Sequence, residues 1–136
     1  MVFLRPGVRE FLEEAEKHFE LIIYTAAAQI YADPIIDALE NTSQLFSKRL
    51  YRQHCRRRVL SDNSEVYIKE LRSVADRKYD SSMLVDDNWV HVHANEGRVL
   101  EVRAFVDPAK QKDKELSWVL SELLRDDTWA GKSHAL

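Results

Sequence analysis

The chain has 136 residues, of which 45% are hydrophobic and 32% charged, and its formal net charge at pH 7 is −3. This length suits one domain with a sizeable core, and the slight acidity argues against generic nucleic-acid binding by the whole surface. No apolar run approaches the ~18 residues of a membrane span, and no secretory signal is recognisable. The single Cys55 cannot form an internal disulfide, which favours a reducing compartment.

Apolar residues at helical spacing predict three helices, over residues 8–19, 26–39 and 116–124. Pro34 lies inside the second helix, where we expect it to start a new helical segment or to kink the helix. Residues 128–136 have little pattern, and we expect them to fray as a C-terminal tail.

Short apolar runs between these helices predict strands. The expected strands cover residues 21–24, 45–51, 66–68, 82–85 and 99–102. Strands that alternate with helices indicate an α/β domain with a mainly parallel sheet.

Three of the apolar runs end at polar residues suited to phosphate and magnesium chemistry. Thr25 follows the run at 21–24, Lys69 follows 66–68, and the pair Asp86 and Asp87 follows 83–85. Ligands of such sheets bind at the carboxyl ends of strands. A hydroxyl and an amine can bind phosphate, and adjacent carboxylates offer hard oxygen ligands to Mg²⁺. No Asp-x-Asp occurs anywhere in the 136 residues.

Each of these positions also has a purely structural interpretation. Asp86 and Asp87 could cap a helix and place an acid in its first turn, and Thr25 could be a helix N-cap. Lys69 could be an ordinary surface lysine. The sequence leaves both interpretations open at each position.

A basic stretch lies between Lys48 and Arg58, with six basic residues and no acidic one. It could recognise a phosphorylated or acidic peptide through arginine, or be a solvated strand and loop. If Arg52 lies in a strand, Arg56 falls beyond its end, so one of the two can point into the site.

Three other chemistries find no support. A cysteine-nucleophile phosphatase requires an arginine six positions after its cysteine, and Ser61 stands there after Cys55. Cys55, His91 and His93 match no zinc framework. No glycine-rich phosphate loop exists.

An ordered series of short motifs covers nearly the whole chain. The series includes Arg5-Pro6-Gly7-Val8, Tyr24-Thr25-Ala26-Ala27, Arg49-Leu50-Tyr51-Arg52, Tyr67-Ile68-Lys69-Glu70-Leu71 and Val85-Asp86-Asp87. It resembles the phosphatases that act on the RNA polymerase II C-terminal domain, which belong to the haloacid dehalogenase superfamily. The resemblance implies a Rossmann-like parallel sheet flanked by helices.

The resemblance also implies roles for individual residues. Thr25 matches the hydroxyl that binds the transferring phosphoryl group, and Lys69 matches the lysine that stabilises the phospho-aspartyl state. Asp86 and Asp87 match the acids that hold Mg²⁺.

Two further positions match substrate contacts of that family. Arg52 matches an arginine near the substrate phosphate, and Tyr31 matches an aromatic position of the peptide groove. The implied partner is a phosphorylated protein or peptide, with the RNA polymerase II C-terminal domain as one candidate. The implied location is nuclear or cytoplasmic.

The family's first motif, Asp-x-Asp-x-Thr or Val, should stand before Arg5 and is absent. Its first Asp is the nucleophile and its second the general acid, so we expect this chain to be inactive alone. We expect residues 1–127 to be an N-terminally incomplete phosphatase domain of a longer protein that lacks the nucleophile-bearing strand. The strands near Ile22 and Leu84 would then lose a neighbour, which would make the chain marginal or aggregation-prone.

Three functions remain open. The first is a Mg²⁺-dependent phosphatase for phosphoserine or phosphothreonine in proteins, here without its nucleophile. The second is a pseudophosphatase that binds a phosphopeptide or protein partner without turnover. The third, suggested by another branch of the family, is a structural component of mitochondrial protein import, against which the lack of a membrane segment or presequence in the chain argues.

Overall fold

The computed structural model describes residues 4–41, 43–95, 97–105, 113–125 and 134–135. The helices are α1 (Val8–Glu16), α2 (Gln29–Glu40), α3 (Leu71–Val74), α4 (Trp89–Val92) and α5 (Glu115–Leu123). The strands are β1 (Glu20–Tyr24), β2 (Lys48–Leu50), β3 (Arg56–Val59), β4 (Glu65–Ile68), β5 (Leu84–Asp86), β6 (Val99–Glu101) and β7 (His134–Ala135). Short 3-10 helices cover Arg52–His54, Asp76–Ser81 and His93–Asn95.

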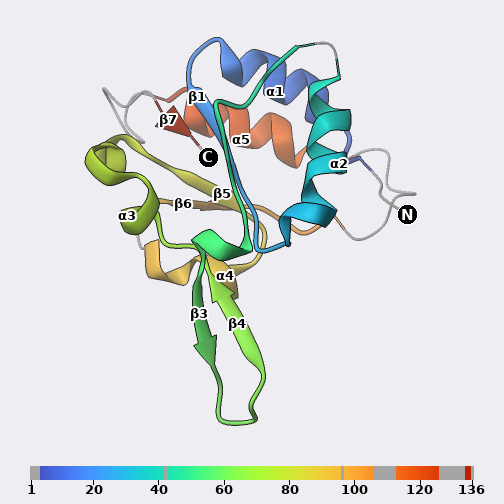
Figure 1. Cartoon of the computed structure of the whole chain (residues 1–136). Helices are drawn as coiled ribbons and strands as arrows, with labels where there is room; N and C mark the ends of the chain where they lie inside the picture. Colours follow the sequence, from blue (N-terminus) through green and yellow to red (C-terminus); the bar gives the residue numbers. More distant parts are fainter. Residues whose placement is uncertain (1–3, 42, 96, 106–112, 126–133, 136) are drawn as a thin grey trace.

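The strands form three groups (Figure 1). β1 pairs in parallel with β2 on one side and with β7 on the other, and β5 pairs in parallel with β6. β3 and β4 form an antiparallel hairpin that projects from the body of the molecule. The parallel pairs and their flanking helices confirm the predicted α/β class.

β1 and β5 lie in separate sheets. Among the described residues, β5 pairs with β6 alone, and β7 meets β1 only at Glu20 and Leu21. Side chains connect the two sheets instead, because Tyr24 of β1 and Leu84 of β5 belong to one buried cluster. From the sequence we expect that β1 and β5 each lack a neighbouring strand. In the described structure, β1 and β5 contact each other through side chains and do not pair through backbone hydrogen bonds.

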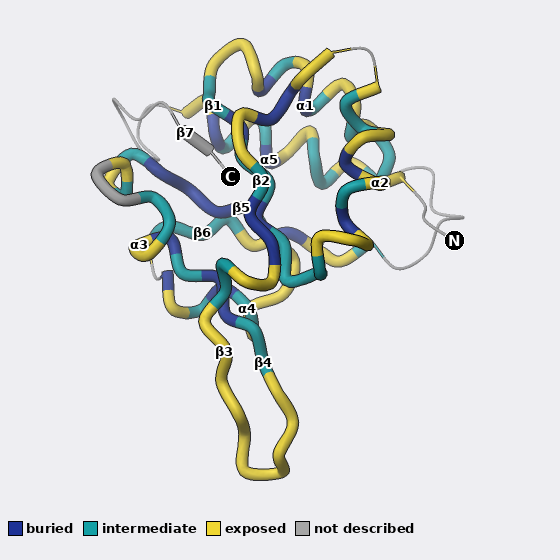
Figure 2. The backbone as a smooth tube through the Cα atoms, in the orientation of Figure 1, coloured by how far each residue is buried: buried dark blue, intermediate teal, exposed yellow. Residues whose placement is uncertain are grey.

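Helices cover the sheets through apolar faces (Figure 2). Leu12 and Ala15 of α1 pack with Leu21 of β1 and with Ile36 of α2. On the α5 side, a second cluster is formed by Met83, Val102, Val119 and Leu123. Each fully buried aliphatic side chain contributes about 1.5–3 kcal/mol. No helix in the described part of the chain is both long and apolar enough to span a bilayer.

One of the two alternatives expected at Pro34, and the expected order of strand and loop at Arg52 and Arg56, are wrong. α2 runs as one helix from Gln29 to Glu40 with Pro34 inside it, so Pro34 starts no new segment, and the alternative of a kink stays a prediction. Proline removes the hydrogen bond to the carbonyl four residues earlier, but Ile30 and Pro34 are exposed, so water can solvate that carbonyl. Arg52 lies in a 3-10 helix and Arg56 begins β3, which reverses the expected order of strand and loop.

The other elements keep their predicted positions with shifted ends, and β2 is shorter than the predicted 45–51. Of the four residues of β4, only Ile68 is buried. Residues 128–133 and 136 of the predicted tail lie outside the described part. His134 and Ala135, within the same stretch, form β7.

Candidate functional site

Lys69 and Asp86 form an ion pair at the ends of β4 and β5. The side chain of each is 10% exposed, so water screens the pair weakly. Asp86 Oδ1 also accepts the Asn88 backbone N–H at 2.9 Å. Lys69 is therefore not the surface lysine that the structural interpretation required.

Backbone contacts fix the position of Lys69. Its N–H donates to the His91 carbonyl at 2.7 Å. Its carbonyl accepts from Asn95 Nδ2 at 2.7 Å, and Asn95 Oδ1 accepts the Leu71 N–H at 2.7 Å. Asn95 is 1% exposed. The sequence analysis assigned no role to Asn95, because an asparagine before a turn glycine gives no sign that it will be buried.

Thr25 lies just beyond β1, where its N–H donates to the Leu50 carbonyl at 2.9 Å. Thr25 Oγ1 accepts the Ala27 N–H at 3.0 Å, which shapes the loop before α2. The N-cap of α2 is Ala28, so Thr25 is not that cap. Within the described residues the hydroxyl donates to no protein group, which leaves its proton available to a phosphate oxygen.

Arg52 contacts the same loop. Its Nε donates to the Ala26 carbonyl at 2.9 Å, and its N–H donates to the Ala27 carbonyl at 3.1 Å. The guanidinium carbon lies 4.8 Å from the centroid of the Tyr67 ring, an attractive cation–π arrangement. Arg52 and Thr25 therefore both contact this loop, and their roles as phosphate ligands remain predictions.

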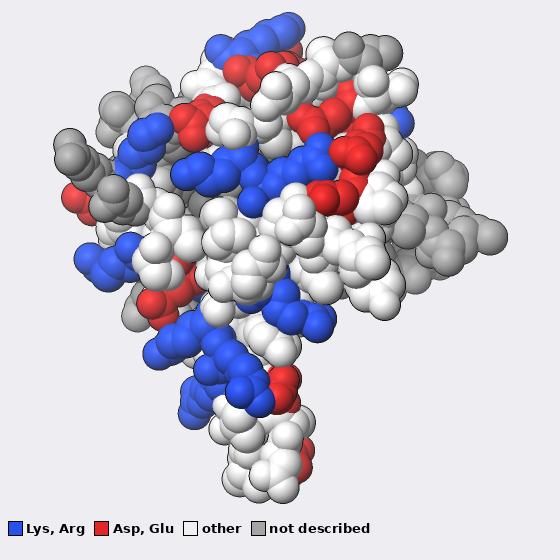
Figure 3. All heavy atoms as spheres, in the orientation of Figure 1, with Lys and Arg blue, Asp and Glu red and all other residues white. Residues whose placement is uncertain are grey.

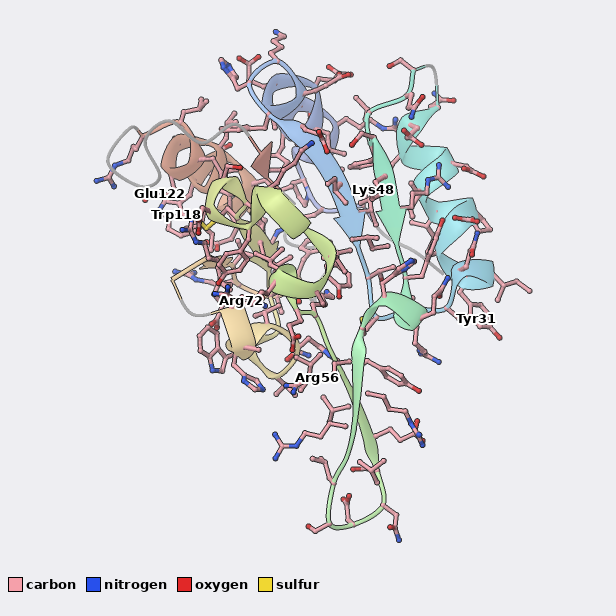
Figure 4. All side chains as sticks on the ribbon, turned by 60° about the vertical axis from the view of Figure 1, so that its left-hand side comes forward. Tyr31, Lys48, Arg56, Arg72, Trp118 and Glu122 are labelled. Carbon is pink, nitrogen blue, oxygen red and sulfur yellow. The ribbon has the colours of Figure 1, made fainter. Side chains whose placement is uncertain are left out.

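Tyr31 lies in the first turn of α2 and is 73% exposed (Figure 4). Among the described residues, its side chain makes no hydrogen bond or ring contact with Thr25, Arg52 or Lys69. Its role in a peptide groove remains a prediction.

Tyr24 connects the segments at the edge of the candidate site through its hydroxyl. Its hydroxyl donates to the His54 carbonyl at 2.5 Å and accepts the Glu70 N–H at 3.3 Å. Burial raises the pKa of Tyr24 to about 12, so the hydroxyl keeps its proton at neutral pH. This residue links β1 to the segments around Arg52 and Lys69, and the sequence analysis did not single it out.

Cys55 lies beside this edge, with Sγ 3.9 Å from the Thr25 carbonyl oxygen. Burial raises the pKa of the thiol, which disfavours the thiolate that a nucleophilic cysteine needs. In the described ranges, no three His, Cys, Asp or Glu side chains gather as a metal-binding group.

Asp86 and Asp87 fit part of a magnesium shell. Mg²⁺ typically keeps several waters and takes one or two carboxylates plus substrate phosphate. The Asp87 side chain is exposed and open to water and a phosphate, whereas the Asp86 carboxylate is 10% exposed and already bound by Lys69 and the Asn88 N–H. The N-cap of α4 is Asn88, which accepts the Val90 N–H at 3.0 Å, so neither Asp86 nor Asp87 is the cap.

Comparison with known proteins identifies the family to which the chain belongs. The model of the NLI interacting factor-like phosphatase family matches residues 1–131. Nuclear envelope morphology protein 1 of Schizosaccharomyces pombe is 35% identical over 106 residues, covering 77% of this chain and 21% of that protein. CTD nuclear envelope phosphatase 1B of Danio rerio is 39% identical over 87 residues, covering 64% of this chain and 33% of that protein.

A shorter match joins the chain to phosphatase PSR1 of Saccharomyces cerevisiae, 44% identical over 54 residues, or 40% of this chain and 12% of that protein. The chain thus spans a third or less of the length of these three relatives. The family match covers nearly all of the chain, including every predicted site residue. The chain therefore belongs to the NLI interacting factor-like phosphatases, within the haloacid dehalogenase superfamily.

Proposed function

We propose that this chain forms the phosphate- and magnesium-binding part of a protein phosphatase for phosphoserine or phosphothreonine. The observation that carries the proposal is the Lys69–Asp86 ion pair. The hydroxyl of Tyr24, next to Thr25, accepts the N–H of Glu70, next to Lys69. Cys55 contacts both the Thr25 and the Arg52 carbonyls. A positive charge beside the Asp86 carboxylate offsets the repulsion between that carboxylate and an incoming phosphate.

Each residue takes a separate part in this proposal. The Thr25 hydroxyl donates to one phosphoryl oxygen, and the Lys69 ammonium and the Arg52 guanidinium hold the others. Asp86 and Asp87 would hold Mg²⁺, which when bound neutralises charge on the phosphoryl group. Catalysis also needs the family's carboxylate nucleophile and general acid, for which the 136 residues offer no Asp-x-Asp.

That absence favours a second candidate function, a phosphopeptide-binding module without turnover. Thr25, Arg52 and Lys69 can bind a phosphate without a nucleophile. The two candidates differ in one observable, the release of inorganic phosphate.

A titration tests the phosphate site that both candidates share. The 136-residue chain is mixed with a phosphoserine peptide or its unphosphorylated twin, in Mg²⁺ or in EDTA. Phosphate release supports the phosphatase, whereas selective binding without release is expected of both candidates, because the chain has no Asp-x-Asp nucleophile. Thr25→Val should weaken phosphopeptide binding about tenfold, or ~1.4 kcal/mol, whereas Ile30→Val, on an exposed turn of α2, should not. Equal binding of both peptides would refute both candidates.

The mass and N-terminal sequence of the endogenous protein complete this test. A protein that carries Asp-x-Asp-x-Thr or Val ahead of Arg5 supports the phosphatase, and one that begins at Met1 supports the binding module. The names of two relatives refer to the nuclear envelope and to the CTD. They support a nuclear location among the two expected, and a phosphorylated protein as the ligand.

A further inference from the structure

The β3–β4 hairpin carries three consecutive arginines that its own fold does not need. All four residues of β3 are exposed, and a two-stranded ribbon is marginally stable in water by itself. Successive side chains of a strand point to opposite faces. Arg56 and Arg58 therefore share one face, and Arg57 lies on the other.

The two faces differ in charge balance. Arg57 forms an ion pair with Glu65, which also accepts the Tyr67 hydroxyl. On the opposite face, Arg56 Nε lies 3.2 Å from Glu70. In the described part of the chain, no carboxylate pairs with Arg58. Within the hairpin itself, Glu65 neutralises Arg57, whereas the face of Arg56 and Arg58 keeps an excess of positive charge. Arg52, whose guanidinium lies over the Tyr67 ring, adds a positive charge beside the Arg57 face.

A third arginine extends this excess. Arg72 of α3 stacks on the Tyr79 ring at 4.2 Å, and among the described residues it forms no ion pair. Arg56 and Arg72 lie on the same side of the hairpin, with Tyr31 on the other (Figure 4). Lys and Arg atoms gather along the hairpin and beside its base (Figure 3). We call Arg56, Arg58 and Arg72 the basic track.

The basic track begins beside the candidate site. Arg56 lies opposite Ile68 in the hairpin register, and Ile68 directly precedes Lys69. A ligand whose phosphate sits at Lys69 would bring its neighbouring residues to the base of the hairpin.

We propose that the basic track binds an acidic segment next to the phosphorylated residue of the protein ligand, an inference that rests on the function proposed above. Arg56 and Arg58 are two residues apart, or about 6.6 Å along the strand, which matches alternate side chains of an extended peptide. Arginine binds carboxylates through two parallel hydrogen bonds. The only aromatic of the hairpin, Tyr67, is on the other face, so this face lacks the stacking platform of single-strand nucleic-acid sites.

Adjacent arginines give a matched test by fluorescence anisotropy on the 136-residue chain. Arg58→Gln and Arg57→Gln remove the same charge from exposed positions of one strand, and circular dichroism checks that both fold. The probes are a phosphoserine peptide with flanking glutamates, the same peptide with glutamines, and the unphosphorylated acidic peptide. We expect Arg58→Gln to reduce the preference for the acidic phosphopeptide about three- to tenfold, and Arg57→Gln to change it less than twofold.

The outcomes separate this inference from the proposed function. If the phosphopeptide with flanking glutamines binds as tightly as the one with flanking glutamates, the proposal for the basic track is wrong and the proposed function is unaffected. If the acidic peptide binds equally well with and without its phosphate, and this binding depends on Arg58, the proposal for the basic track is supported and the proposed function is wrong. The proposal for the basic track is also wrong if Arg57→Gln and Arg58→Gln change the preference for the acidic phosphopeptide equally. It is likewise wrong if a single-stranded RNA of equal charge binds more tightly than the acidic phosphopeptide and this binding depends on Arg58.

Discussion

Asn95 holds the backbone on both sides of Glu70, directly after Lys69, through one buried amide. Its Nδ2 donates to the Lys69 carbonyl at 2.7 Å, and its Oδ1 accepts the Leu71 N–H at 2.7 Å. Because Nδ2 also donates to the Val92 carbonyl at 3.0 Å, one side chain joins the end of β4 to α4. The position of the Lys69 ammonium therefore depends on a residue that does not approach a ligand.

Replacing Asn95 should destabilise the chain strongly. Asn95→Ala leaves three buried backbone groups without partners, and each unsatisfied group costs about 1–3 kcal/mol. We expect a loss of about 3 kcal/mol or more in urea unfolding. Gln53→Ala is the control, at an exposed amide side chain. A loss below ~1 kcal/mol for Asn95→Ala would show that water replaces the amide.

Breaking the Lys69–Asp86 pair from one side should cost more than removing both charges. Lys69→Met leaves the Asp86 carboxylate without its partner at 10% exposure, which costs about 3–5 kcal/mol. Adding Asp86→Asn should recover much of this loss. Lys78→Met, which breaks an exposed pair with Glu20, should cost under ~1 kcal/mol. Urea unfolding measures all four proteins, and a double variant no more stable than Lys69→Met would contradict the argument.

Tyr24 should give a pH-dependent contribution in the alkaline range. Burial raises its folded-state pKa from 10.0 to about 12, so its contribution is complete below pH 10 and is lost as pH rises toward 12. The stability difference between the wild type and Tyr24→Phe should be about 1–3 kcal/mol at pH 8 and shrink by pH 12. Tyr31→Phe, at an exposed tyrosine, should show no such trend. A difference that stays constant to pH 12 would contradict the raised pKa.

Arg49 should stabilise the chain in an acid-sensitive way. It pairs with Asp33, Asp37 and Glu40 at 3.1, 2.8 and 2.5 Å. Burial opposes ionisation of Glu40, but hydrogen bonds from Arg49 and two backbone N–H groups outweigh it and lower the pKa of the carboxyl. Because the folded-state pKa of Glu40 is lowered, its ionised carboxylate stabilises the folded chain at pH values above the unfolded-state pKa of 4.5. This contribution is lost as the pH falls through the folded-state pKa.

We therefore expect Arg49→Gln to cost about 2 kcal/mol at pH 7 and much less near pH 3. Denaturant midpoints at both values measure this, with Lys17→Gln, at an exposed pair with Glu14, as the control. An equal cost at pH 7 and pH 3 would show that Arg49 acts through packing alone.

The chain by itself should be marginally stable. In the described residues β5 pairs only with β6, and β1 meets β7 at two residues, so much of both strands presents an unpaired edge. We expect a broad thermal transition and concentration-dependent self-association in light scattering. A monodisperse monomer with a cooperative melt would contradict this prediction.

The sequence by itself determined the class of the fold and the approximate positions of its main elements. Helical spacing identified α1 and α5, and apolar runs identified β1 and β5, because these patterns report local periodicity and burial. The polar residues after those runs pointed to Thr25, Lys69, Asp86 and Asp87, and an ordered series of motifs pointed to the family that comparison confirmed.

Only the tertiary structure decided how those residues are used. Lys69 is buried because Asp86, 17 residues further along the chain, neutralises it, and no local pattern encodes such a contact. The position of Lys69 directly after β4 likewise depends on hydrogen bonds between β3 and β4. The orientation of Arg52 depends on its hydrogen bond to the Ala26 carbonyl. Pairwise contacts between distant residues determine side-chain positions, whereas local sequence determines backbone preference, and this is why the sequence could name candidate site residues but not their geometry.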